Sequence, residues 1–171
     1  MNAQTTEPIL EKHPNALLIE KLYIGIQRGN LAVISACYDE AAYFEDIAFQ
    51  RRHRTEILEM WRYVCHGHPG VTFDAYDISA DDRKGSGRWS ARYMFGQTKN
   101  DPGRPVNNHI SSTFLFRDNL IIEHRDHCDP MAWARQAVGF PFALALGLVT
   151  PLRRYMASRK LHKFLEEEGQ E

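Results

Sequence analysis

Two side chains on one predicted strand, His124 and Asp126, have the types and the spacing that acid–base chemistry uses. Residues 120–128 carry the apolar and β-branched side chains typical of a strand, in which residues two apart point to the same face. A carboxylate beside an imidazole raises its basicity and fixes its tautomer, as a general base requires. The same pair also suits a solvated strand end or a structural hydrogen bond, and the sequence leaves both interpretations open.

The strand that carries this pair is expected to be the second arm of a hairpin. Residues 109–116 form a β-branched and aromatic run, and residues 117–119 have the sequence Arg-Asp-Asn. Asp and Asn favour turns because they bond to their own backbone and tolerate left-handed geometry. Asp129 then suits the N-cap of a following helix, with Pro130 at the first helical position.

The remaining pattern predicts helices first and a meander of strands afterwards. Apolar spacing predicts a helix over 14–28, which Gly29 ends, and Asn30 suits the cap of a second helix that runs to about Tyr38. The other predicted elements are a strand at 41–48, a helix at 55–65, strands at 71–79 and 86–98, and a last helix at 151–168. Helices followed by long antiparallel strands are typical of an α+β fold.

Length and composition bound the function classes. A chain of 171 residues suits one domain with a real core. The net charge of −1, from 21 basic and 22 acidic residues, gives no electrostatic reason to expect a nucleic-acid partner. The three cysteines fit a reduced, cytoplasmic chain without disulfides. The polar N-terminus has no secretory core, and the mostly apolar run 138–149 is too short to span a membrane.

Two stretches resemble one known family. IIEHRDHCDPMAWARQAVG, residues 121–139, is similar to the last strand and exit of SnoaL-like domains in the nuclear transport factor 2-like superfamily. RGNLAVISACYDEAAYFEDIAF, residues 28–49, is similar to the pattern of helices and a strand that begins such domains. The resemblance implies a cone-shaped, strongly curved antiparallel β-sheet with N-terminal helices that enclose a cavity. We expect this domain at 14–139, after a flexible arm at 1–13 and before a helical extension of the same domain at 140–171.

The superfamily also contains ketosteroid isomerases, and the resemblance to them implies a role for Asp46. Glu45-Asp46 stands where those enzymes carry a Glu-Asp pair whose Asp is the base. Burial beside an apolar cavity makes a carboxylate more basic. The alternative is that Asp46 only accepts hydrogen bonds at a strand end. The oxyanion residues depart from the pattern, because the family's Tyr aligns near Leu22, next to Tyr23, and its protonated Asp aligns near Ser112.

A second resemblance, to polyketide cyclases, implies a role for Asp129. Their catalytic acid lies at the same strand exit, before a helix that carries a Gln, and Gln136 matches that helix. The N-cap role is a sufficient structural alternative for Asp129. His109 is a candidate polar group of the cavity. With it, the residues predicted to bind a ligand are Tyr23, Tyr43, Trp61, Trp89, Tyr93, His109 and Ser112.

These features lead to two hypotheses about function. One is an isomerase, cyclase or epoxide hydrolase that needs no cofactor and acts on an apolar ligand. The other is a non-catalytic protein on the same fold that binds a ligand or a partner. No metal site is predicted, because the loose pair His66 and His68 fits a surface loop.

A homodimer is expected, as in the superfamily, through the outer face of the sheet. The many large apolar residues in 140–149 suggest that the C-terminal extension contributes to the same interface. Their alternative role is to fold back over the mouth of the cavity.

Overall fold

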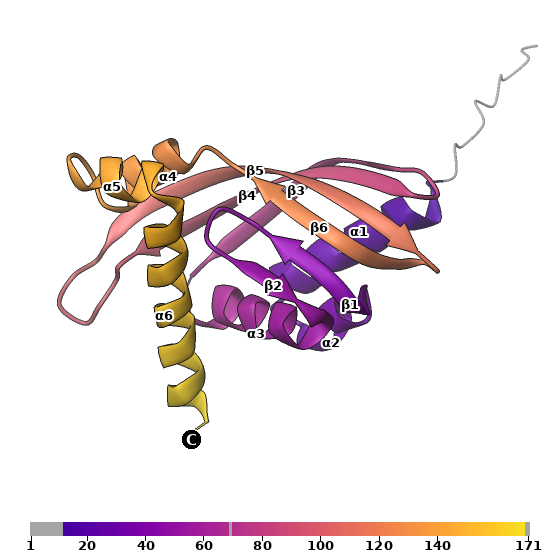
Figure 1. The fold of residues 1–171 in the computed structure, drawn as a ribbon, viewed down its shortest axis with the longest axis horizontal. Helices are drawn as coiled ribbons and strands as arrows, with labels where there is room; N and C mark the ends of the chain where they lie inside the picture. The colour runs from indigo at the N-terminus through magenta and orange to yellow at the C-terminus, as the bar shows by residue number, and fades with distance from the viewer. Residues whose placement is uncertain (1–11, 69, 170–171) are drawn as a thin grey trace, which may run out of the picture.

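The computed structural model describes residues 12–68 and 70–169, so most of the predicted arm at 1–13 lies outside the described residues. Figure 1 shows one curved sheet with helices under its concave face and at one end. The elements are α1 Pro14–Gln27, α2 Leu31–Ser35, β1 Tyr38–Glu45, β2 Gln50–Arg52, α3 His53–His66, β3 Thr72–Ala80, β4 Lys84–Phe95, β5 Arg104–Arg117, β6 Leu120–His127, α4 Pro130–Ala137, α5 Phe142–Leu148 and α6 Thr150–Glu168.

The six strands form one curled sheet that does not close, in the order β2-β1-β6-β5-β4-β3. The long strands β3 to β6 pair antiparallel, as the alternating pattern and the turns between them predicted. The exception is that β1 runs parallel to β6. The fold is therefore the expected curved α+β sheet, with one parallel pairing that joins its N-terminal and C-terminal strands.

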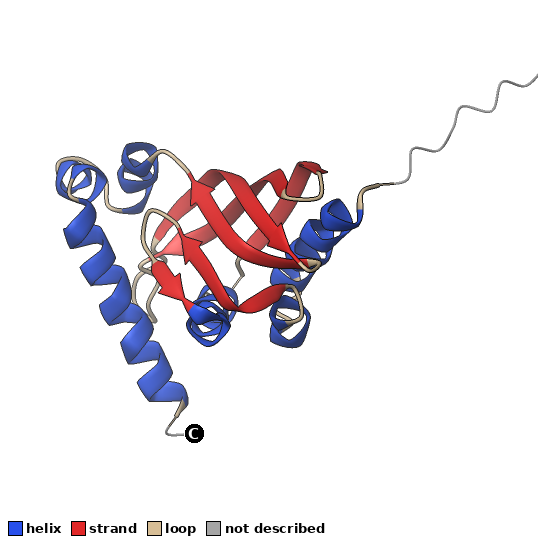
Figure 2. Ribbon diagram, turned by 45° about the vertical axis from the view of Figure 1, so that its right-hand side comes forward, coloured by secondary structure: helices blue, strands red, loops and turns tan. Residues whose placement is uncertain are grey.

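The first three helices cover the concave face of the sheet (Figure 2). Gly29 has a φ of +61°, the left-handed geometry in which glycine commonly ends a helix. The side chain of Asn30 accepts a hydrogen bond from Val33 N at 3.1 Å, so the predicted cap of the second helix is confirmed. The core between these helices and the sheet includes the fully buried residues Ile19, Leu22, Ile26, Ile34, Tyr38, Phe44, Ile57, Trp61 and Ile121.

Two predicted boundaries differ from the structure near Asp46. The strand predicted at 41–48 lies at Tyr38–Glu45, and Gln50–Arg52 forms a short strand that pairs with it. The reason is a turn in which the Asp46 carboxylate accepts hydrogen bonds from the backbone N–H groups of Ala48 and Phe49. The chain reverses there, which places Asp46 just beyond the strand end.

The face predicted for β6 also changes at one point. Alternation placed Ile122 with His124 and Asp126, yet Ile121 is fully buried and Ile122 is only half-buried. The pairing between β5 and β6 shifts by one residue here, since Phe116 lies opposite Ile121 while Leu115 lies opposite Glu123. Such a bulge reverses the faces on one side of it. His124 and Asp126 lie beyond the bulge and share the inner face.

The C-terminal segment packs against the rest of the chain. Asp129 accepts hydrogen bonds from Met131 N at 2.8 Å and Ala132 N at 3.1 Å, which confirms it as the N-cap of α4. Helix α5 buries Ala143 and Leu146 against α4. Helix α6 descends beside the sheet toward α3, and its Leu161 joins the main core (Figure 1).

Candidate active site

A mostly apolar pocket lies between the concave face of the sheet and the helices α3, α4, α5 and α6. Its volume is about 180 Å³. Strand β4 lines it with Trp89, Ala91, Tyr93 and Phe95, which alternate along the strand and so share one face. The walls carry several aromatic side chains, which suits a flat ligand with few polar contacts.

His124 and Asp126 meet as the spacing on β6 predicted. The Nε2 atom of His124 lies 2.9 Å from Asp126 Oδ1, and His124 is fully enclosed. Phe44 on β1 and Phe114 on β5 lie opposite His124 in the sheet, and their rings pack against the imidazole. His124 does not itself line the pocket. It lies behind Asp126, which does.

The hydrogen bonds around His124 fix its tautomer. Trp61 Nε1–H donates to Tyr38 Oη at 3.3 Å, and Tyr38 Oη lies 2.7 Å from His124 Nδ1. A carboxylate can only accept, so Nε2 carries the proton that bonds to Asp126. With the proton on Nε2, Nδ1 is the atom that accepts the hydrogen bond from the Tyr38 hydroxyl. Burial raises the pKa of Tyr38 well above its ordinary value, which keeps this hydroxyl protonated.

One oxygen of Asp126 is held by three donors and the other remains for a ligand. Oδ1 accepts from His124, from the Ser112 hydroxyl and from Trp89 Nε1 at 3.4 Å. Ser112 lies directly opposite Asp126 on β5 and also accepts from Trp89 Nε1 at 3.0 Å. Oδ2 accepts no hydrogen bond from residues 12–68 or 70–169. Because Asp126 lines the pocket, a ligand is the remaining partner for Oδ2.

Asp46 is the second carboxyl group that lines the pocket. Burial, with a smaller contribution from the negative charge of Asp126, raises its pKa to about 6. The backbone N–H groups of Phe49 and Ala48 act in the opposite direction, because they stabilise the charged form. Asp46 is therefore a base whose strength is close to that required for proton transfer near neutral pH.

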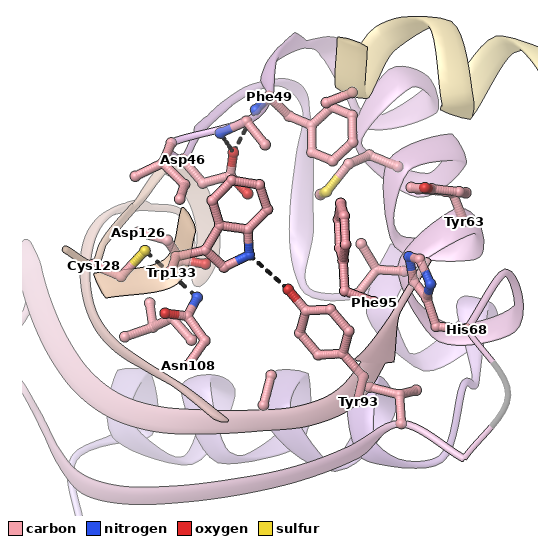
Figure 3. A pocket seen from close by; sticks show the side chains of 18 of the residues that line it. Asp46, Phe49, Tyr63, His68, Tyr93, Phe95, Asn108, Asp126, Cys128 and Trp133 are labelled. Atoms are coloured by element: carbon pink, nitrogen blue, oxygen red, sulfur yellow. Dashed lines mark hydrogen bonds between the residues drawn. The ribbon is translucent and has the colours of Figure 1, made fainter. Parts of the chain in front are cut away.

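Tyr93 adds a hydroxyl group to the pocket wall. Trp133 Nε1–H, from α4, donates to Tyr93 Oη at 2.8 Å (Figure 3). Burial raises the pKa of Tyr93 to about 12, so the phenol stays protonated at neutral pH. In the hydrogen bond with Trp133, the Tyr93 oxygen is the acceptor. The Tyr93 O–H donates to no acceptor among residues 12–68 and 70–169. Tyr93 can therefore donate a hydrogen bond to a ligand oxygen.

The other predicted residues fall into three places. Trp61 and Trp89 line the pocket. Ser112 and Tyr23 lie behind the wall, and Tyr23 Oη is enclosed without a hydrogen-bond partner among the described residues. Burial makes the largest contribution to raising the pKa of Tyr23, and the negative charge of Asp126 also raises it.

Three predicted residues lie outside the pocket. His109 is exposed on the outer face of β5, because its neighbours Asn108 and Ile110 face inward. Tyr43 also lies on the outer side, where its hydroxyl donates to Glu45 at 2.9 Å. Asp129 is exposed at the start of α4.

Several pocket residues were missed at the sequence level. Asn108 and Cys128 line the pocket, and their alternation with Ile110 and Asp126 was a usable signal. Burial raises the pKa of Cys128 to about 11, so it is a thiol and not a nucleophilic thiolate at neutral pH. Other missed residues include His68 from the turn after α3, and Trp133, Arg153 and Lys160 from the C-terminal helices.

Residues 12–68 and 70–169 contain no group of three or more His, Cys, Asp or Glu side chains arranged to hold a metal ion. Within the same ranges, every helix is too short or too polar to cross a membrane.

Comparisons with known proteins agree on the fold. The family model of the SnoaL-like domain matches residues 19–124. A candidate polyketide cyclase from Streptomyces antibioticus is 21% identical, with a TM-score of 0.61 over 72% of this chain and 98% of that protein. An LEH-like epoxide hydrolase from M. tuberculosis is 17% identical, with a TM-score of 0.60 over 79% and 97%.

A third structure, a candidate SnoaL-like polyketide cyclase from Jannaschia sp. CCS1, is 16% identical, with a TM-score of 0.62 over 81% of this chain and 99% of that protein. Identities this low show a shared fold and no more. A search of curated proteins finds no match.

Proposed function

Because the chain belongs to the SnoaL-like domain family, we propose that it is a cofactor-independent enzyme that isomerises or cyclises an apolar, ring-containing carbonyl compound. The observation that carries this proposal is one aromatic pocket lined by two carboxyl groups, Asp46 and Asp126, and by the hydroxyl of Tyr93. Proton removal next to a carbonyl needs a base on one side and a hydrogen-bond donor for the developing oxyanion on the other.

In this proposal Asp46 is the base and Tyr93 stabilises the oxyanion. Asp46 takes a proton from the carbon beside the carbonyl group, and the carbonyl oxygen gains negative charge as it accepts the hydrogen bond from Tyr93. Asp46 then returns the proton to another carbon of the same molecule, which completes an isomerisation. Asp126 keeps Asp46 basic through its charge, and His124 holds Asp126 in place.

The same set of groups suits the opening of an epoxide, the activity for which the LEH-like epoxide hydrolase from M. tuberculosis is named. There, a carboxylate would activate water and a proton donor would assist the departing oxygen. The neighbour supports this variant only through its fold, so we place it second to isomerisation and cyclisation.

The experiment uses 5-nitrobenzisoxazole, whose ring opens once a base removes one proton from carbon. The wild-type chain should open this probe faster than free acetate does, and Asp46→Asn should lower the rate at least about 100-fold. The control is Asp129→Asn, since Asn also caps helices well and Asp129 lies outside the pocket. That variant should keep the wild-type rate.

Two results would reject the enzyme in favour of the non-catalytic binding protein. One is a wild-type rate no higher than that of acetate at equal carboxylate concentration, provided that the probe binds. The other is an Asp46→Asn variant with wild-type turnover. A loss of turnover in Asp129→Asn would instead move the acid to the strand exit, as the resemblance to polyketide cyclases implied.

We also propose that the chain forms a homodimer, with the C-terminal extension in the interface. Several large apolar side chains there are exposed, with Phe140 at 80%, Phe142 at 70% and Leu148 at 70%. Leu146 from the same segment lines the pocket, so the extension contributes to both the pocket wall and this exposed surface. Light scattering should show a dimer for the wild type and a monomer for Phe142→Glu with Leu148→Glu. A wild-type monomer contradicts the dimer.

The location of the chain stays a prediction. The three cysteines Cys37, Cys65 and Cys128 are all free, and burial raises the pKa of each to about 11. Free thiols of this kind support our proposal of a reducing compartment such as the cytoplasm.

A further inference from the structure

The pocket carries opposite charges at its two ends. Figure 3 shows Asp46 and Asp126 on one side, and His68, Tyr63 and Phe95 on the other. Lys160 of α6 belongs to the second side, because its Nζ atom lies 4.3 Å from the centre of the Phe95 ring. We call His68, Phe95 and Lys160 the basic end of the pocket.

The ammonium group of Lys160 is not neutralised by a protein carboxylate. No acidic group of residues 12–68 or 70–169 lies within 4.0 Å of it, whereas Lys163 on the same helix pairs with Glu167. Lys160 is exposed as a residue, and the partial burial of its ammonium group lowers its pKa. An anion at this position would restore the lost stabilisation.

Arg153 is the other cation on the pocket wall, and four of its five N–H donors are already used. Its guanidinium donates to the backbone oxygens of Ile47 at 2.6 Å, Leu146 at 2.7 Å and Gly147 at 3.2 Å. It also donates to the Thr150 hydroxyl at 3.2 Å. Of the two cations that line the pocket, Lys160 is therefore the one with more donors left for a ligand.

His68 adds a second donor beside Lys160. Its ring packs 5.0 Å from the ring of Tyr63 and 5.7 Å from that of Tyr93, measured between centroids. Its ring nitrogens make no hydrogen bond with the described residues, and its side chain lines the pocket. Burial lowers the pKa of His68, and the charge of Lys160 lowers it further, so it is a neutral imidazole with one N–H to donate.

We propose that the ligand of this pocket is a flat, ring-containing acid whose anionic group binds Lys160 and His68, at the end remote from Asp46 and Asp126. The inference rests on the proposed function, because it names the substrate class of the same pocket. The two carboxylates repel an anion, so the charges impose one orientation, with the acid group at α6 and the reacting carbon at Asp46. Lys160 lies outside the matched residues 19–124, so this specificity belongs to the extension.

The test compares 2-naphthoate with 2-naphthamide, which share their rings and differ in charge. Titration calorimetry should show that the wild-type chain binds the naphthoate at least about tenfold more tightly. Lys160→Gln should remove this preference by weakening naphthoate and leaving naphthamide unchanged. Lys163→Gln is the matched control, because it removes an exposed lysine from the same helix and should keep the preference.

A further variant tests the orientation. Asp126→Asn should change the affinity for naphthoate by less than about threefold, because the anion binds at the far end. A gain of tenfold or more would place the anion beside Asp126 and overturn the proposal. So would equal binding of the two probes by the wild type, a preference that survives Lys160→Gln, or no binding of either probe. These measurements involve no turnover. The proposed ligand class can therefore be rejected while Asp46→Asn still abolishes the reaction, and the proposed reaction can be rejected while the preference for naphthoate remains.

Discussion

The two ends of the pocket differ in how their side chains are held. At the carboxylate end, Asp126 lies on a strand in the middle of the sheet, and donors on neighbouring strands fix one of its oxygens. At the basic end, Lys160 extends from a helix that meets the sheet through few contacts. Hydrogen bonds from surrounding side chains hold the Asp126 carboxylate in one geometry, so this fold suits chemistry at the sheet and specificity at the helix.

The largest effect should come from the buried histidine at the carboxylate end. His124→Phe keeps an aromatic ring but leaves Tyr38 Oη and Asp126 Oδ1 without one partner each. We expect a loss of about 3 kcal/mol in the free energy of unfolding, measured with urea. His127→Gln, an exposed change on the same strand, should cost less than about 0.5 kcal/mol. A loss under about 1 kcal/mol in His124→Phe would mean that this end is not rigidly held.

The next change removes the group that anchors the C-terminal extension beside the pocket. Arg153→Met deletes the hydrogen bonds to Ile47, Leu146 and Gly147 while it keeps an apolar stem. We expect a loss of about 2 kcal/mol, because three carbonyl oxygens lose a charged donor. Hydrogen exchange should rise in α5 and α6 but not in β6. Arg159→Met is the control, and equal exchange in both variants would contradict the anchoring role.

A smaller effect is expected from the pH dependence of Asp46. Its folded pKa of about 6 lies above the ordinary 3.8, so the folded chain binds the proton more tightly than the unfolded chain. The full shift corresponds to about 3 kcal/mol, and partial exposure of Asp46 to solvent reduces its effect. Stability should therefore fall as pH rises between about 4 and 6, by about 1.5 kcal/mol, and then level off. Asp46→Asn should lack this decrease, and thermal melts from pH 4 to pH 8 measure the difference. A wild type that gains stability relative to the variant over this range would show the opposite shift.

The smallest structural effect should be at the wall between the two ends. Tyr93→Phe removes the acceptor of Trp133 Nε1–H and the donor proposed for the ligand oxygen. We expect a loss of about 1 kcal/mol in stability, since the site is only half-buried. Turnover of 5-nitrobenzisoxazole should fall about tenfold, with binding of the probe little changed. Trp133→Phe breaks the same hydrogen bond without removing the hydroxyl, so its turnover should stay near that of the wild type.

The sequence by itself determined the fold class and which residues of a strand share one face. Alternation placed Trp89, Tyr93 and Phe95 together, and a spacing of two placed His124 beside Asp126. Helix caps were equally local, because Asn30 and Asp129 act within three residues of themselves. Patterns of this kind can be derived from sequence since they depend on the geometry of one element.

Only the tertiary structure decided which face each isolated polar residue takes and what the extension contributes. His109 and Tyr43 point outward because Ile110 and Phe44, their neighbours along the strand, are buried, and only the packing of the helices on the sheet decides which face is inward. The bulge that buries Ile121 depends on how β6 pairs with β5. Arg153 meets Ile47 across 106 positions of the sequence, and Lys160 reaches Phe95 across 65. Such contacts form only once the helices pack, so the basic end of the pocket has no signature in the sequence.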